Sequence, residues 1–152
     1  MPPTFHGIVS ISGSLTHILN LQELKSAFGN VYASLLDNGV FVFNIYLEAA
    51  FQSSWNGSIT GDVKDEDAWA LKTIYYPEEK ISRLHFTIFQ LLEGSWQRTD
   101  NTVEEKCYSV AEIRSALEDV GFTEISVYDA ERDFGVERDP GNAYFICRKA
   151  HI

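Results

Sequence analysis

The segment Gly7–Leu47, GIVSISGSLTHILNLQELKSAFGNVYASLLDNGVFVFNIYL, carries the pattern that decides the fold. Gly7–Ser12 is a short apolar run with β-branched residues next to glycine, which predicts a strand. Apolar residues then recur at helical spacing from Leu21 to Leu36, and Asp37-Asn38-Gly39 is a typical helix end. Val40–Leu47 is almost continuously apolar, which indicates a strand buried on both faces.

A strand, a crossover helix and a second buried strand make a parallel βαβ unit, whose connection is expected to be right-handed. From residue 68 to 108 the pattern changes to an antiparallel meander, with turns at Pro77–Lys80 and Glu93–Ser95. We expect the rest of the chain, this meander included, to extend or cover the βαβ unit. We therefore predict a single α/β domain over residues 1–152, with an added antiparallel β layer.

The C-terminal third predicts a further helix and two strands. Ser109 and Glu112 have the spacing of a capping box, and Gly121 ends the apolar stripe that follows. Ile125–Tyr128 and Ala143–Cys147 are the predicted strands. The segments 57–67 and 129–142 are rich in glycine and charge, and we expect both to be loops.

Three short motifs resemble the class I S-adenosylmethionine-dependent methyltransferases. They are Gly13-Ser14-Leu15-Thr16-His17 after the first strand, Leu35-Leu36-Asp37-Asn38-Gly39-Val40 before the second, and Tyr108–Ile113 followed by Leu117–Phe122. Their order and spacing are similar to those of the fourth to sixth strands of that family. The resemblance covers almost the whole chain and implies a partial Rossmann-like methyltransferase sheet.

The resemblance also implies a function. It suggests a methyltransferase acting on a small-molecule acceptor with S-adenosylmethionine as cofactor, present here as its C-terminal half. That family holds the cofactor mainly on its first half, through a glycine-rich turn and an acidic residue. This sequence contains no G-x-G-x-G. Within the present chain, the resemblance makes Ser14 and Leu15 the candidate cofactor-binding residues.

The turn Gly13–His17 stands at the carboxyl end of the first strand, where ligands bind in open α/β sheets. Imidazole titrates near neutral pH, so His17 is the candidate catalytic base. The alternative is that Ser14 or Thr16 caps the next turn and that His17 is a solvated loop residue.

Four further residues are candidates for substrate binding. Tyr46 and Trp55 lie near the end of the second strand, where they either wall an acceptor pocket or pack beneath a loop. Asn44 is a candidate because the resembling family has Asp or Asn facing the ligand in this region. Arg132 would bind an acidic acceptor, or is a surface charge in an acidic loop.

Composition excludes several other classes. The chain has 152 residues and a formal net charge of −10, which disfavours binding to nucleic acid. No apolar run is long enough to span a membrane. Cys107 and Cys147 are far apart, as expected for free thiols in the cytoplasm. The acidic segment 62–67 lacks the spacing of a calcium loop, so no metal site is predicted.

The alternative function is a non-catalytic binding or assembly module. The Gly7–Ser12 strand would lie at an edge of the sheet with unpaired backbone groups, which is a template for another chain. The sequence therefore predicts a homo-oligomer, or a partner that pairs with this strand.

Overall fold

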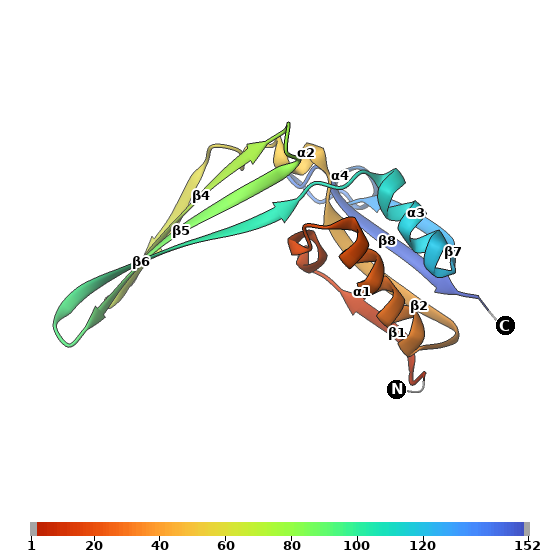
Figure 1. Cartoon of the computed structure of the whole chain (residues 1–152). Helices are drawn as coiled ribbons and strands as arrows, with labels where there is room; N and C mark the ends of the chain where they lie inside the picture. The colour runs from red at the N-terminus through yellow and green to blue at the C-terminus, as the bar shows by residue number, and fades with distance from the viewer. Residues whose placement is uncertain (1–2, 151–152) are drawn as a thin grey trace.

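The computed structural model describes residues 3–150 and consists of an α/β body and an antiparallel arm (Figure 1). The body sheet has the order β1-β2-β8-β7, and the arm has the order β3-β4-β5-β6. The body strands are β1 (Phe5–Ser10), β2 (Leu35–Tyr46), β7 (Phe122–Asp129) and β8 (Asn142–Lys149). The arm strands are β3 (Ile59–Val63), β4 (Asp67–Tyr76), β5 (Ile81–Leu92) and β6 (Ser95–Lys106). The helices are η1 (Ser14–His17), α1 (Leu21–Ser34), α2 (Glu48–Phe51), α3 (Val110–Val120) and α4 (Ala130–Phe134).

The predicted βαβ unit is present, because β1 and β2 are parallel and α1 connects them. β8 runs antiparallel to both of its neighbours, β2 and β7. Helices α1 and α3 lie side by side along the body sheet (Figure 1) and share one core with it. That core is made of alternate residues of the strands and the inward faces of the helices: Leu24, Phe28, Phe41, Phe43, Ile45, Ile113, Leu117 and Phe145.

The sequence predicted that β2 is buried on both faces, and this prediction is wrong. Only one face of β2 is fully buried. Phe41, Phe43 and Ile45 are buried, whereas Val40 and Val42 on the opposite face are only partly buried. The second face of the body sheet also exposes Val9 and Ile146. Helices α1 and α3 cover one side of this sheet, because both pack into the same core, and Phe134 of the short helix α4 packs on Tyr128 and Tyr144 of the other face.

The predicted helix end at Asp37-Asn38-Gly39 is wrong. Helix α1 ends at Ser34, and Leu35 already pairs with Phe5 at the start of β2. Residues 36–39 form an irregularity in the strand, in which Asn38 has a φ of 62°. The ammonium group of Lys149 donates to the carbonyls of Tyr32 and Leu35 at 3.0 and 2.8 Å. A lysine from the last strand therefore satisfies the helix end that the sequence assigned to a glycine turn.

The two expected loops contain regular structure. β3 lies within the segment 57–67 and pairs antiparallel with β4. Helix α4 lies within the segment 129–142, and the Asp129 carboxylate accepts from the amides of Glu131 and Arg132 at its start. Both elements are short, and their pattern was obscured by the polar residues around them.

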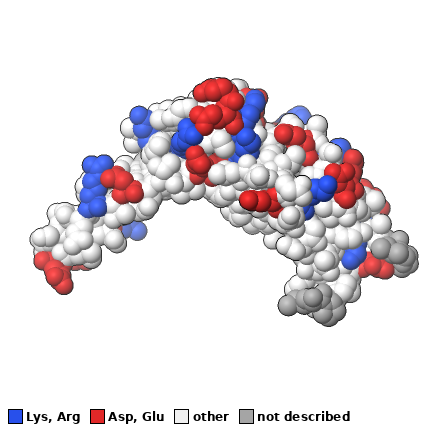
Figure 2. All heavy atoms as spheres, in the orientation of Figure 1, with Lys and Arg blue, Asp and Glu red and all other residues white. Residues whose placement is uncertain are grey.

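The arm extends away from the body, and the whole molecule is arched (Figures 1 and 2). Acidic and basic side chains are mixed on the face shown in Figure 2. Within residues 3–150 no helix combines the length and the apolar character that a membrane crossing needs. Residues 1–2 and 151–152 of the predicted domain lie outside the described part.

The capping box predicted for α3 is confirmed. The Ser109 hydroxyl accepts from the Glu112 amide at 3.2 Å, and the Glu112 carboxylate accepts from the Ser109 amide at 2.7 Å. Gly121 ends the helix with a φ of 112°, in the left-handed region that favours glycine.

Replacing the cap should lower stability. Ser109→Ala removes the hydroxyl acceptor, so we expect a loss of about 1 kcal/mol in the free energy of unfolding. For a chain of this size that corresponds to a melting temperature lower by ~2–4 °C, measured by circular dichroism. Ser115→Ala, at an exposed position inside the same helix, is the matched control and should cause no loss. Equal melting temperatures for the two variants would contradict the role of the cap.

Candidate functional site

A cavity of about 460 Å³ lies where the arm meets the carboxyl ends of β1 and β2. One side is formed by Tyr46 at the end of β2, Ala50 and Phe51 of α2, and Trp55. Ser12, from the turn after β1, also lines it. Its volume is within the range of sites for small molecules. The crevice beyond the carboxyl ends of parallel strands is the usual ligand site of open α/β sheets.

The opposite side of the cavity is one face of the arm sheet. Leu71 and Thr73 of β4, Leu84 of β5 and Glu105 of β6 all line it. Thr73 is paired with Leu84, and the register places Leu84 opposite Val103, two residues before Glu105. Because alternate residues of a strand share a face, these side chains all point to the same side of the sheet. The antiparallel register therefore brings a carboxylate into a surface of apolar and hydroxyl groups.

Glu105 was not among the residues predicted from the sequence. Its side chain is 13% exposed, and its carboxylate lies 3.7 Å from Nε2 of His17. Burial raises the pKa of the Glu105 carboxyl, and the electrostatic influence of the neighbouring His17 imidazole opposes that effect. Its position gave a signal, because Glu105 stands two residues after Val103 and two before Cys107 and so lies between apolar neighbours of the same face.

His17 is held between two acceptors. Its Nδ1 lies 3.2 Å from the carbonyl oxygen of Glu104. A carbonyl oxygen only accepts, so the hydrogen bond requires the proton on Nδ1, which leaves Nε2 directed toward Glu105. The His17 side chain is 43% exposed. It is thus neither a free loop residue nor a core residue, and its Nε2 faces the carboxylate of Glu105 beside the cavity.

Tyr46 and Trp55 come together as an aromatic wall. Their rings meet edge to face with centroids 5.7 Å apart. Burial raises the pKa of the Tyr46 phenol, and the nearby charges of Asp139 and Glu105 add to this effect. Tyr46 is therefore neutral at physiological pH. Both rings line the cavity, and Tyr46 also packs against the small core formed by Phe51, Tyr75 and Cys107.

Asn44 is buried and does not line the cavity. Its Oδ1 accepts from the Gly13 amide at 2.9 Å, and its Nδ2 donates to Asn142 at 2.7 Å. Gly13 has a φ of 67°, and a Cβ there would lie 2.3 Å from the Tyr46 ring. Asn44 thus fixes the turn that carries His17 and holds it against Tyr46.

The other predicted residues make local contacts. The Ser14 hydroxyl donates to the Ile11 carbonyl at 3.1 Å, and Leu15 packs against the core. The turn η1 starts after Gly13 without a side-chain cap from Ser14 or Thr16, and Asn20 caps the next helix, α1. The exposed Arg132 side chain is paired with its neighbour Asp133 at 2.6 Å. Ser14 and Leu15 provide neither a carboxylate for ribose hydroxyls nor a glycine-rich turn, so by themselves they do not fit S-adenosylmethionine.

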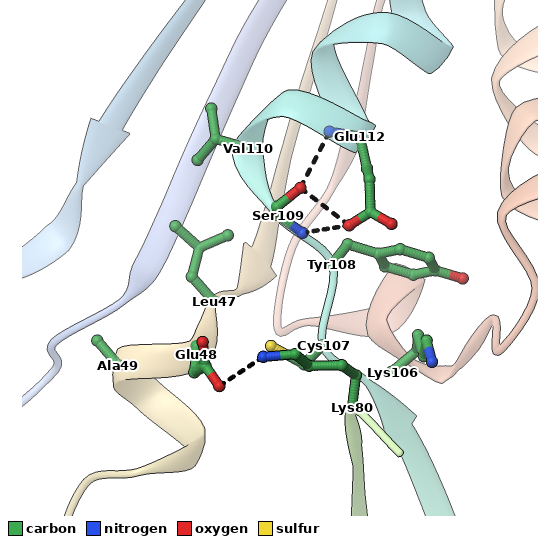
Figure 3. A pocket seen from close by; sticks show the side chains of 10 residues that line it. All are labelled: Leu47, Glu48, Ala49, Lys80, Lys106, Cys107, Tyr108, Ser109, Val110 and Glu112. Atoms are coloured by element: carbon green, nitrogen blue, oxygen red, sulfur yellow. Dashed lines mark hydrogen bonds and ion pairs between the residues drawn. The ribbon is translucent and has the colours of Figure 1, made fainter. Parts of the chain in front are cut away.

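A second cavity of about 440 Å³ lies between α2, the start of β5 and the start of α3 (Figure 3). Its polar groups are already engaged. The Glu48 carboxylate accepts from Lys80 at 2.7 Å and from the Tyr75 hydroxyl at 3.0 Å, and Ser109 and Glu112 bind each other. Burial raises the pKa of the Cys107 thiol, so it is protonated at neutral pH and is a poor nucleophile. The first cavity is therefore the better candidate site.

No family model matches the chain. Over 148 residues it is 18% identical to a protein of Geobacillus sp. (strain WCH70) whose name suggests a methyltransferase, covering 96% of this chain and 60% of that protein. A crystal structure of an S-adenosylmethionine-dependent methyltransferase from Clostridium acetobutylicum has a TM-score of 0.78 at 18% identity, covering 99% of this chain and 61% of that one. The sugar N-methyltransferase KedS8 from Streptoalloteichus sp. has a TM-score of 0.78 at 14% identity, covering 98% and 57%.

A third solved structure holds the cofactor. CalS10, an amino pentose methyltransferase from Micromonospora echinaspora with bound S-adenosylmethionine, has a TM-score of 0.73 at 15% identity, covering 99% of this chain and 60% of that one. The chain thus has the fold of the C-terminal part of S-adenosylmethionine-dependent methyltransferases. It spans about 60% of the length of the proteins that it matches.

The buried Glu105 leads to a stability prediction. Its pKa is raised in the fold, so the associated stability is fully present below the pKa of the unfolded chain and is lost as the pH rises through the raised value. Glu105→Gln has no charge to bury. We expect this variant to melt at a higher temperature than the wild type at neutral pH, and the difference to vanish below the ordinary glutamate pKa of 4.5.

The matched control is Glu104→Gln. Glu104 neighbours Glu105 on β6 but points to the other face, where it is paired with Arg83 at 2.9 Å. This variant should not gain stability at neutral pH. A lower melting temperature for Glu105→Gln at neutral pH would show that the pair with His17 outweighs the burial of the charge.

Proposed function

We propose that this chain forms the acceptor-binding part of an S-adenosylmethionine-dependent methyltransferase for a small molecule. The observation that carries the proposal is the aromatic cavity at the carboxyl ends of β1 and β2, with the His17–Glu105 pair beside it. The neighbouring structures whose titles name sugar or amino pentose methyltransferases support a small acceptor. The two buried cysteines are free, which is consistent with a cytoplasmic protein.

The residues of this chain would position the acceptor and receive its proton. Methyl transfer depends on alignment of two partners and on exclusion of water, and the rings of Tyr46 and Trp55 supply an apolar wall. His17 is the proposed base, since its Nε2 is directed toward the cavity residue Glu105. Asn44 would position His17 indirectly, by holding the turn at Gly13. Arg132 would have to leave Asp133 to bind an acceptor.

The cofactor would be bound mostly by other residues. Neighbouring structures contain S-adenosylmethionine or S-adenosylhomocysteine, but the matched part covers about 60% of their chains. Ser14 and Leu15 would contribute only one border of such a site. We therefore propose that the remaining cofactor contacts come from a polypeptide segment outside this sequence.

Methyl transfer can be tested in a chimera. The chain is joined to the N-terminal part of the Clostridium acetobutylicum methyltransferase that lies outside the match, and binding of S-adenosylmethionine by calorimetry verifies assembly. We expect transfer of labelled methyl groups to a member of a mixture of small amines, alcohols and sugars. His17→Ala should lower the rate by about 100-fold without changing cofactor affinity.

The matched control is His85→Ala. His85 lies on the other face of β5, where its ring contacts the Thr102 hydroxyl at 3.0 Å, and its loss should leave the rate unchanged. A chimera that binds the cofactor but methylates none of the acceptors would contradict the proposed function. The chain alone should show no saturable heat with S-adenosylmethionine or S-adenosylhomocysteine. Micromolar binding would contradict the proposed division of the site.

One observation favours a second candidate, a non-catalytic assembly module. β1 is an edge strand that pairs only with β2 among the described residues, and its sequence carries no Asp, Glu, Lys or Arg. Phe5 and Val9 are 49% and 65% exposed, and a shallow groove runs between β1 and α1. Uncharged edges with exposed apolar residues pair readily with other strands. We propose a second copy of this chain as the occupant of this edge.

Sedimentation velocity tests this association. We expect the wild type to dimerise at micromolar concentration, and Val9→Lys to be monomeric because a charge on the edge opposes pairing. Val136→Lys, at an exposed loop position away from the edge, should remain dimeric. A monomeric wild type would exclude the second copy, and an N-terminal methyltransferase segment would then be the better occupant.

A further inference from the structure

The cavity beside Glu105 has one charged residue among the eleven that line it, and that residue is acidic. The others are aromatic, aliphatic or hydroxyl-bearing side chains, and neither Lys nor Arg is among these lining residues. A charge that is mostly removed from water is costly unless a partner compensates it. Such a surface therefore favours a ligand with a positive charge.

Among residues 3–150, the Glu105 carboxylate has an ion-pair partner but no hydrogen-bond donor. That partner is Nε2 of His17 at 3.7 Å, a distance longer than a hydrogen bond. Ser82 lies directly opposite Glu105 in the β5–β6 pairing. The Ser82 hydroxyl is fully buried and has no hydrogen-bond partner within residues 3–150. The carboxylate thus has acceptor capacity left, and the buried hydroxyl without a partner stands opposite it in the sheet.

The aromatic wall also suits a cation. Tyr46 and Trp55 line the same cavity as Glu105, and the faces of such rings attract ammonium groups. Ser58, Thr60 and Thr73 supply hydroxyls around the remaining surface. Charge, ring faces and hydroxyls therefore occur together in a volume suited to one small molecule.

We propose that the cavity binds a small hydroxylated amine as its ammonium ion, with Glu105 as the residue that selects the amine. Binding of the amine does not depend on the proposed function. If that function holds, the amine is the acceptor and its nitrogen is the methylated atom. An amine is nucleophilic only after it loses a proton. That proton would pass to His17, the proposed base, whose Nε2 lies 3.7 Å from the Glu105 carboxylate.

The proposal can be tested with matched pairs of probes and the isolated chain. The probes are glucosamine against glucose and benzylamine against benzyl alcohol, measured at neutral pH by Trp fluorescence and by protein NMR shifts. We expect the amine of each pair to bind at least ~10-fold more tightly than the alcohol, as for a charge-assisted contact. Glu105→Gln should remove this preference and leave the binding of the alcohols unchanged.

Controls separate recognition from folding. Glu104→Gln keeps the net charge of Glu105→Gln but leaves the cavity intact, so it should keep the preference for amines. Glu105→Gln is expected to be at least as stable as the wild type at neutral pH, so loss of binding would not reflect unfolding. Equal affinity for amine and alcohol in the wild type, no binding of either, or a preference that persists in Glu105→Gln would overturn the proposal.

Failure of the amine site and failure of the proposed methyltransferase function give different results. A chimera that methylates alcohols while the cavity shows no preference for amines would overturn only the choice of acceptor. Preference for amines together with a cofactor-loaded chimera that transfers no methyl group would overturn the enzyme and retain the amine site.

Discussion

The structure depends on the pairing of β2 with β1 on one side and with β8 on the other. This strand supplies Phe41, Phe43 and Ile45 to the core, and the rings of Phe43 and Phe145 stack at 5.1 Å across the β2–β8 pair. Because strand side chains alternate, the same register that buries these residues directs Asn44 and Tyr46 to the other side. Core and candidate site therefore depend on one register.

The turn after β1 is attached to β2, so the position of His17 depends on the register of β2. Asn44 binds the Gly13 amide, and the buried Thr16 hydroxyl lies 3.5 Å from the Tyr46 amide. These contacts attach η1 to the end of β2, and His17 is the last residue of η1. A displacement of β2 would therefore move His17 relative to Glu105, although neither residue belongs to the core.

The arm is joined to the body by a small second core. Phe51, Tyr75 and Cys107 pack together, and the Phe51 and Tyr75 rings stack at 5.4 Å. This cluster lies between the two cavities, since Phe51 lines one and Cys107 lines the other. It fixes the root of the arm against α2, so that a face of an extended antiparallel sheet becomes one side of a pocket.

The sequence by itself determined the elements that have local signals: the βαβ unit, the antiparallel meander and the capped helix α3. Periodicity and capping act within a few residues, so they survive in any tertiary context. It also indicated the turn with His17 and the aromatic pair Tyr46 and Trp55, because both follow predicted strand ends.

The tertiary structure alone decided the end of α1 and the composition of the site. Lys149 reaches the carbonyls of Tyr32 and Leu35 from the far end of the chain, which no local pattern reveals. Glu105 meets His17 across 88 positions because the register of β6 and the tilt of the arm bring them together. Long-range pairing carries no signature in the spacing of one sequence, and so the charged residue of the cavity emerged only from the fold.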